Sequence, residues 1–125
     1  MRRTGHIASI AAVEDVPLNT YSEVSYGAMK GALPVYMKSL ARAVASKGIR
    51  ANVVSPGCTL FEGGAWQQLE LEQPEIYRNA IASTPMGRIA RPEEIAKAVT
   101  FLASPAASFV SGNNLIVDGA FTNRI

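Results

Sequence analysis

The sequence has little of several residue types on which common protein functions depend. Its 125 residues include one cysteine, Cys58, and one histidine, His6. A single cysteine excludes an internal disulfide and fits a reducing compartment, so we expect a cytoplasmic protein. An isolated histidine and an isolated cysteine, with no carboxylate cluster at ligand spacing, also give no support for a metal site.

Charge of one sign and long apolar runs are lacking as well. The chain has 12 basic and 10 acidic residues, a net charge of +2, and its basic residues are scattered apart from Arg2 and Arg3. Without a basic patch there is no electrostatic case for nucleic acid or an anionic membrane as a partner. The apolar runs are far shorter than the ~20 residues of a membrane span. With 48% hydrophobic and 18% charged residues, the composition is that of one soluble globular domain.

The first part of the chain is expected to fold as a strand, a loop and a long helix. Gly5–Ala11 is a short apolar run that predicts a strand, although its length also permits a buried helical turn. Val13–Ser22 has no sustained periodicity and predicts a surface loop. A helix is expected over about Val24–Ser46, with Ser22 or Ser25 as its N-cap. Its inner side follows from three- and four-residue spacings: Leu33, Met37, Leu40, Ala41 and Val44.

Glycine and proline mark the boundaries of the next strand. Gly48 can end the helix in the left-handed conformation, and Ile49–Ser55 then predicts a second strand that Pro56-Gly57 closes. A strand, a helix and a strand make a βαβ unit, whose crossover is right-handed in nearly all cases, so the two strands are parallel. Ser9 and Pro56-Gly57 then lie at the carboxyl ends of their strands, the edge where ligands bind in open α/β sheets.

The second half of the chain carries weaker signals. Prolines that can open helices and a closing apolar run divide it into three helices and one strand. The expected elements are a partial amphipathic helix with Trp66, Leu69 and Leu71, a helix over Pro74–Ser83, a helix from Pro92 to Ser104 with Ile95, Val99 and Leu102 facing inward, and a strand over Asn114–Val117.

One pair of residues on the long helix carries reactive chemistry. Tyr26 and Lys30 are four residues apart, so on a helix they share a face, with Cβ atoms roughly 5–6 Å apart. A cation beside a phenol favours the phenolate form, which makes a tyrosine a usable proton donor and acceptor near neutral pH. By spacing alone, such a pair is more often two residues on a solvated helix face. Ser9 and Pro56-Gly57, at the ends of two strands, favour the functional interpretation.

Five ordered motifs resemble the short-chain dehydrogenase/reductase family. They run nearly from end to end of the chain at compatible spacings. The matches are Ser9 after the first strand, Tyr26 and Lys30 as YxxxK, Gly48–Gly57 as KGIRVNxVxPG, Gly87-Arg88 with Pro92–Ala96 as GR-x-PEEIA, and Ser111-Gly112 with Val117–Gly119 as SGxxxxVDGG. The resemblance implies an α/β fold, the C-terminal half of a Rossmann-like doubly wound parallel sheet with about three parallel strands and flanking helices.

The resemblance also implies an activity and a set of site residues. The chain is expected to belong to an oxidoreductase that transfers hydride between NAD or NADP and a carbonyl compound or secondary alcohol. Tyr26 would be the general acid/base, and Ser9 would hold the substrate oxygen. Lys30 would favour the phenolate of Tyr26 and hydrogen-bond the nicotinamide ribose, and Tyr26 would contact the cofactor as well. The residues whose backbone groups would border the nicotinamide are Pro56, Gly57 and Thr59.

Two aromatic residues and the oligomeric state complete what the resemblance implies. Phe61 and Trp66 lie in the segment that covers the substrate in this family, and they could line its pocket or pack in a core or lid. The apolar character of this segment disfavours a strongly anionic substrate, so the expected partner is a small alcohol or ketone. The family also implies a homo-oligomer, a dimer or a tetramer, with contacts through the helix of Tyr26 and the last strand.

Three features depart from the family pattern. The spacing from Ser9 to Tyr26 is longer than usual, which suggests an enlarged loop near the substrate entrance. The threonine that commonly contacts the nicotinamide has no clear match, because Thr59 comes early and Phe61 stands near its place. The family's N-terminal half is absent, and with it the glycine-rich turn for the pyrophosphate and the residues that select NAD or NADP.

The third departure has structural and functional consequences. Residues 1–125 are expected to form one partial domain, the catalytic half, which would be inactive alone. The strand around Ile7 would keep an unpaired edge, so we expect association or poor solubility unless something covers it. An N-terminal truncation of a longer protein is one hypothesis. The alternative is a non-catalytic fragment that acts only as a subunit-interface module.

Overall fold

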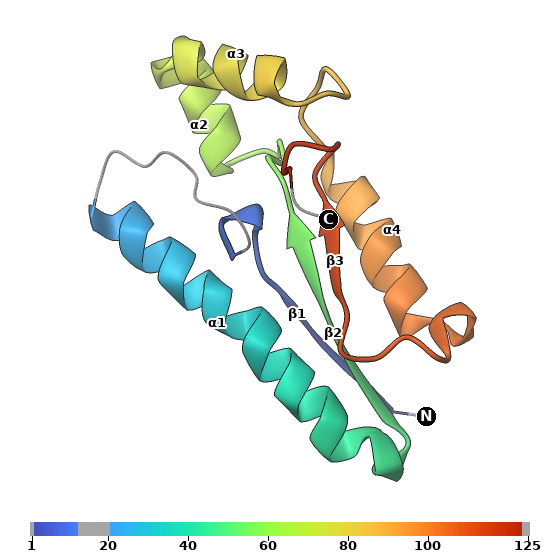
Figure 1. Ribbon diagram of the computed structural model, residues 1–125. Helices are drawn as coiled ribbons and strands as arrows, with labels where there is room; N and C mark the ends of the chain where they lie inside the picture. Colours follow the sequence, from blue (N-terminus) through green and yellow to red (C-terminus); the bar gives the residue numbers. More distant parts are fainter. Residues whose placement is uncertain (1, 13–20, 124–125) are drawn as a thin grey trace.

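The computed structural model describes residues 2–12 and 21–123, which form a three-stranded sheet with helices on both faces (Figure 1). The strand order is β1-β2-β3, so β2 lies in the middle. The expected fold class is confirmed. In chain order the elements are β1 Arg2–Ile7, the short 3-10 helix η1 Ile10–Ala12, α1 Tyr21–Val44, η2 Ala45–Lys47, β2 Ile49–Pro56, α2 Ala65–Glu72, α3 Pro74–Ser83, α4 Pro92–Ala103, η3 Pro105–Ala107 and β3 Asn114–Val117.

Both strand pairs are parallel, as predicted. All six residues of β1 pair with β2, and the last four residues of β2 pair with β3. Gly48 ends η2 with a φ of 69°, the left-handed conformation expected of it. The predicted bounds of α3 and β3 are also those observed.

The first strand begins and ends earlier than predicted. Gly5–Ala11 was the expected range, but pairing with β2 starts at Arg2 and stops at Ile7. The chain turns after Ala8 because the backbone oxygen of Ser9 accepts a hydrogen bond from the N–H of Ala12 at 2.9 Å. The polar start of β1 has no strand periodicity of its own, so its conformation comes from pairing with β2 rather than from local propensity.

The long helix also begins earlier than predicted. It starts at Tyr21, so Ser22 and Ser25 lie inside α1 and the prediction that one of them is the N-cap is wrong. At the other end, Ala45–Lys47 continue as a 3-10 helix, a common form for a last helical turn. The loop expected over Val13–Ser22 lies outside the described residues up to position 20.

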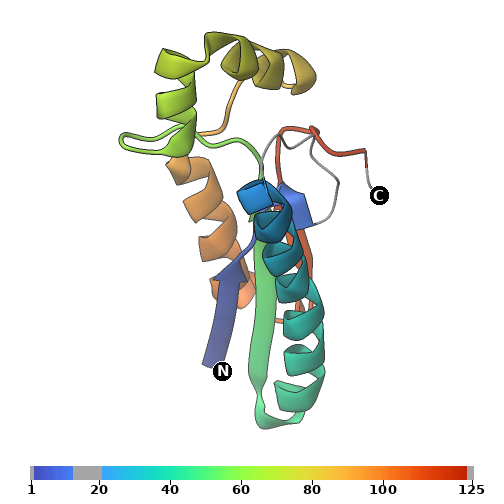
Figure 2. The same ribbon diagram turned by 90° about the vertical axis from the view of Figure 1, so that its left-hand side faces the viewer.

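The helices α1 and α4 lie on opposite faces of the sheet (Figures 1 and 2). Ala51 and Val53 of β2 pack in a cluster with α1. Arg50, Asn52 and Val54 alternate with them and line a cavity beside α4. Both connections step across the sheet in the same direction, from β1 to β2 and from β2 to β3. The first connection passes over one face of the sheet through α1, and the second passes over the other face through α4. Two parallel crossovers that step in the same direction over opposite faces have opposite hands, so one of them is left-handed, which is rare.

The buried core lies between α1 and the sheet. Met37 and Ala41 of α1 pack against Ala8, Ala51 and Val53, and Leu33 and Leu40 flank this cluster. The predicted inner side of this helix is therefore confirmed for Leu33, Met37, Leu40 and Ala41, whereas Val44 is half-buried and lies outside this cluster.

One residue predicted to face inward, Val99 of α4, and one apolar residue of the predicted amphipathic helix, Leu71 of α2, are exposed. Leu102 of α4 is buried as expected. Both α2 and α3 are short and pack mainly against each other above the sheet, so little apolar surface is available to cover Leu71 (Figure 1). Over the described ranges, no helix has the length and apolar character needed to cross a membrane.

Replacement of a core methionine tests this packing. Met37 is 1% exposed, so Met37→Ala is expected to lower the free energy of unfolding by about 2–5 kcal/mol. Met29, on the same helix, is 75% exposed, and Met29→Ala is expected to change it by less than about 0.5 kcal/mol. Urea unfolding of both variants measures the difference, and equal losses would contradict the assignment of the core.

Candidate active site

An open cleft of about 920 Å³ lies where β1 and β2 end. It brings together all eight residues that the sequence predicts for the site, which come from four separate segments. Around the cleft lie Ser9, Tyr26, Lys30, Pro56, Gly57, Thr59, Phe61 and Trp66. They meet because parallel strands place their carboxyl ends at one edge of the sheet.

The ammonium of Lys30 joins α1 to the end of β1. Its Nζ donates a hydrogen bond to the backbone oxygen of Ile7 at 3.1 Å and lies 5.6 Å from the centroid of the Tyr26 ring. At this distance the cation is attracted to the ring, and its remaining protons can be donated to a ligand. Tyr26 is 49% exposed at the cleft. The two residues therefore share a helix face, as their spacing predicts.

Ser9 is held at the end of β1 by the turn that follows it. Its Oγ accepts a hydrogen bond from the N–H of Ala11 at 3.3 Å. This bond uses the oxygen as an acceptor, so the hydroxyl proton can be donated to a group in the cleft.

The segment after β2 passes very close to the end of β3. A Cβ at Gly57 would lie 2.8 Å from the Cα of Asp118, so a residue with a side chain could not sit there without displacing β3. The hydroxyl of Thr59 donates a hydrogen bond to the backbone oxygen of Gly57 at 3.0 Å. Gly57 and Thr59 thus form one compact turn at the edge of the cleft.

The N–H and C=O of Thr59 lie on the side of the chain away from Ala90. Ala90 pairs with this segment: its N–H donates to the oxygen of Cys58 at 3.0 Å, and its oxygen accepts from the N–H of Leu60 at 2.9 Å. Because neighbouring peptide groups of an extended chain alternate in direction, the N–H and C=O of Thr59 face away from Ala90. Thr59 lines the cleft, so this donor and this acceptor belong to a residue at its edge.

Two aromatic side chains form part of the wall. Phe61 is 52% exposed, and its ring packs on Gly64, where a Cβ would lie 2.8 Å from ring atoms. Trp66 is half-buried in the first turn of α2. Both line the cleft. The sequence allowed this position or packing in a core or lid.

The opposite wall is a face of α4, which sequence reasoning missed. The residues of α4 that line the cleft are Pro92, Ile95, Ala96, Val99 and Thr100. Ile95 and Val99 were expected to pack inward, but over this half of α4 the apolar face meets the cleft rather than the sheet. An apolar stripe on a helix has the same spacing whether it faces a core or a cavity, so no signal in the sequence could have separated the two.

An ion pair fixes the segment that carries Ala90. Arg88 donates two hydrogen bonds to the Glu94 carboxylate, from Nη2 to Oε1 at 2.6 Å and from Nη1 to Oε2 at 2.8 Å. The N–H of Arg91 adds a third, to Oε2 at 2.9 Å. The hydrogen bonds from Arg88, and then that from Arg91, lower the pKa of Glu94 from 4.5 to about 2. Glu94 therefore stays ionised and holds the segment on the first turn of α4.

Cys58, between Gly57 and Thr59, lines a different pocket from the cleft. Burial raises the pKa of its thiol to about 11, so the thiol is protonated at neutral pH. Among the residues that the structure describes, no three His, Cys, Asp or Glu side chains gather as metal ligands.

Comparison with known proteins identifies the family. A family model described as enoyl-(acyl carrier protein) reductase matches residues 1–122. Galactitol 2-dehydrogenase (L-tagatose-forming) of Cereibacter sphaeroides is 39% identical over 123 residues, which are 97% of this chain. The chain belongs to the short-chain dehydrogenase/reductase family. The predicted resemblance is therefore confirmed.

Solved structures of the family agree with the fold. A 7α-hydroxysteroid dehydrogenase complexed with NADH has a TM-score of 0.81 and 32% identity and covers 98% of this chain. An NADPH-bound short-chain oxidoreductase of Pseudomonas aeruginosa PAO1 has a TM-score of 0.82 and 26% identity. The chain spans about half the length of these relatives: 47% of the galactitol dehydrogenase, 45% of the steroid dehydrogenase and 47% of the Pseudomonas protein.

The Arg88–Glu94 ion pair predicts how the stability of the protein depends on pH. The pKa of Glu94 is lowered on folding, so its contribution to stability is full above about pH 4.5 and is lost as the pH falls toward 2. Glu94→Gln is expected to destabilise the protein at pH 7, and the difference from the unaltered protein should shrink as the pH falls from 5 to 2. Urea unfolding at several pH values measures this.

Glu93→Gln is the matched control. It removes a carboxylate from the same helical turn, so the interaction with the helix dipole changes similarly while the Arg88 pair remains. A pH-dependent difference of equal size in both variants would show that the ion pair is not its source.

Proposed function

We propose that this chain is the catalytic half of an NAD- or NADP-dependent oxidoreductase that interconverts a carbonyl compound and a secondary alcohol. The observation that carries the proposal is the meeting of Ser9, Tyr26 and Lys30 at one cleft. Membership of the short-chain dehydrogenase/reductase family supports the oxidoreductase chemistry. One neighbour in structure is complexed with NADH and another with NADPH, which supports a nicotinamide cofactor.

The donors and acceptors of the cleft fit the nicotinamide end of such a cofactor. The ammonium of Lys30 can donate to ribose hydroxyls, and the N–H and C=O of Thr59 match a carboxamide, which both donates and accepts. Pro56 and Gly57 would border the ring. The 125 residues contain no glycine-rich pyrophosphate turn, so the phosphates would be bound by another half of the domain.

The chemistry divides between three side chains. A bound nicotinamide supplies the hydride in reduction and accepts it in oxidation. The hydroxyl of Tyr26 donates its proton to the carbonyl oxygen in reduction and takes one from the alcohol in oxidation. Lys30 favours the phenolate that Tyr26 becomes after donating. The hydroxyl of Ser9 donates a hydrogen bond to the substrate oxygen and stabilises the negative charge that develops there.

The walls of the cleft favour an uncharged substrate. Phe61, Trp66 and Ile95 present apolar surface to it, and Lys30, the cation in its described lining, is accounted for by the proposed cofactor contact. The substrate is a small alcohol or ketone without a strongly anionic group. With a single cysteine and scattered charges, the protein acts in the cytoplasm.

Exposed apolar side chains on α1 support self-association. Met29, Val35 and Tyr36 are exposed on this helix. We infer that α1 contributes to a dimer or tetramer.

The exposed apolar side chains of α1 also favour a second candidate function, a non-catalytic module that pairs with longer relatives through α1. A saturable change in nicotinamide fluorescence supports the enzyme, and its absence together with co-purification of a longer relative supports the module.

Removal of one hydroxyl tests the proposed mechanism. The substitution is made in the longest natural protein that contains these residues. Tyr26→Phe removes the proton donor and keeps the ring. It is expected to lower kcat by about 10²–10⁴-fold and to change nicotinamide binding much less, because the ring and Lys30 remain. Steady-state kinetics and a fluorescence titration measure the two quantities.

Tyr36→Phe is the control for this substitution. Tyr36 lies on the same helix, and its ring contacts His6 edge-on, at 6.3 Å between centroids, outside the cleft. Turnover is expected to be unchanged in this variant. If Tyr26→Phe also kept its turnover, Tyr26 would not be the acid/base.

A further inference from the structure

The carboxylate of Glu94 binds the chain on both sides of Ala90. Arg88, which precedes Ala90, donates two hydrogen bonds to it, at 2.6 and 2.8 Å. The N–H of Arg91, the residue after Ala90, donates a third, at 2.9 Å. An arginine and a carboxylate joined by two parallel hydrogen bonds have a well-defined mutual geometry. Ala90 is therefore held in place relative to the first turn of α4.

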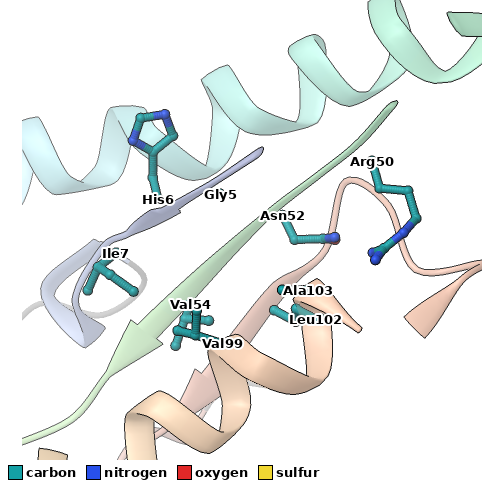
Figure 3. A pocket seen from close by; sticks show the side chains of 9 residues that line it. All are labelled: Gly5, His6, Ile7, Arg50, Asn52, Val54, Val99, Leu102 and Ala103. Atoms are coloured by element: carbon teal, nitrogen blue, oxygen red, sulfur yellow. The ribbon is translucent and has the colours of Figure 1, made fainter. Parts of the chain in front are cut away.

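The helix that carries Glu94 is itself anchored on the sheet. Leu102, in the second half of α4, is 7% exposed. Figure 3 shows Val99 and Leu102 on the side of α4 that faces Val54 and Asn52 of β2, around a cavity of about 260 Å³. Because α4 packs on β2 in this way, the carboxylate in its first turn has a fixed position relative to that strand.

The segment that follows β2 depends on Ala90. The end of β3 holds this segment as far as Gly57, whose N–H donates to the last residue of that strand at 2.9 Å. Beyond Gly57, the oxygen of Cys58 and the N–H of Leu60 are both bonded to Ala90, at 3.0 and 2.9 Å. Thr59 lies between these two bonds, so the position of Ala90 sets the direction of the Thr59 peptide groups.

The hydroxyl proton of Thr59 is used within its own turn. It is donated to the backbone oxygen of Gly57 at 3.0 Å, so a donor from Thr59 toward the cleft must come from its backbone. Phe61, which stands near the place of the family's usual threonine, has no hydrogen-bonding group in its side chain. The N–H and C=O of Thr59 are therefore the groups suited to a ligand that both donates and accepts.

We propose that Glu94 is a positioning residue for the cofactor: through Ala90, it fixes the N–H and C=O of Thr59 so that they bind the carboxamide of the nicotinamide. The inference rests on the proposed function, because it concerns the cofactor of that site. Its consequence is selectivity for the group on the pyridine ring. A carboxamide donates and accepts and so matches both groups of Thr59, whereas a methyl ketone in its place can only accept.

Glutamine cannot replace the carboxylate in this arrangement. Each oxygen of Glu94 accepts a hydrogen bond from Arg88. In Glu94→Gln one of these oxygens becomes an NH₂ group, so a donor then faces a donor of Arg88. The contact with Arg88 is weakened, and Ala90 no longer fixes the peptide groups of Thr59.

Calorimetric titration of two nucleotides tests the proposal in the longest natural protein that contains these residues. One ligand is NADH or NADPH, whichever binds. The other is the reduced 3-acetylpyridine analogue of the same nucleotide, which carries a methyl ketone in place of the carboxamide. Glu94→Gln is expected to raise the Kd of the carboxamide nucleotide by about threefold to tenfold and that of the analogue by less than about twofold. A general loosening of the protein would raise both Kd values equally.

Glu93→Gln is the matched control. It removes a carboxylate from the same helical turn and keeps the three hydrogen bonds to Glu94, so both Kd values should stay those of the unaltered protein. Arg88→Met covers the case in which Glu94→Gln does not fold, which circular dichroism reveals. It keeps the hydrogen bond from Arg91 and should show the same selective rise in Kd.

Hydrogen exchange gives a readout that needs no cofactor. The N–H of Leu60 is protected by its bond to Ala90, so a peptide that contains Leu60 should exchange faster in Glu94→Gln than in Glu93→Gln. Unchanged exchange, or an equal rise of the two Kd values, would overturn this inference alone. No saturable binding of either nucleotide by the unaltered protein would overturn the proposed function as well.

Discussion

Strand β2 is buried on both faces and is hydrogen-bonded in parallel to β1 along one edge and to β3 along the other. Ala51 and Val53 on one face hold α1, while Arg50 and Asn52 on the other hold the chain that leads into β3. Parallel neighbours must end at the same edge of the sheet. The cleft is therefore a product of strand pairing, and its residues meet there although they come from distant parts of the sequence.

The elements that could be predicted from the sequence are those with signals in neighbouring residues. The bounds of α3 and β3 follow from a proline at a first helical turn and from Asp118-Gly119, which are signals within a few residues. The start of β1 was missed, because its arginines and threonine become a strand only by pairing with β2. The wall formed by α4 was missed as well, because the apolar residues of a helix have the same spacing whether they face a core or a cavity.

The cleft and the cavity beside Arg50 are neighbours that share Ile7 and Val99 in their linings. Lys30 is bonded to Ile7 at the end of β1, and Gly5 to Ile7 also border the cavity. The side chains proposed for proton transfer are positioned by this chain alone. The groups that bind the phosphates of the cofactor would come from another half of the domain.

A fluorescence titration of NADH and NADPH with the natural protein that contains these residues tests the central claim most directly. The account predicts a saturable change for at least one of the two, with an apparent Kd that rises in Lys30→Ala, because the ammonium at the cleft would bind the ribose. Lys47→Ala, at the end of η2 and remote from the cleft, should not change it. No saturable change with either nucleotide, or equal binding by the Lys30→Ala protein, would contradict the assignment of this cleft as a nicotinamide site.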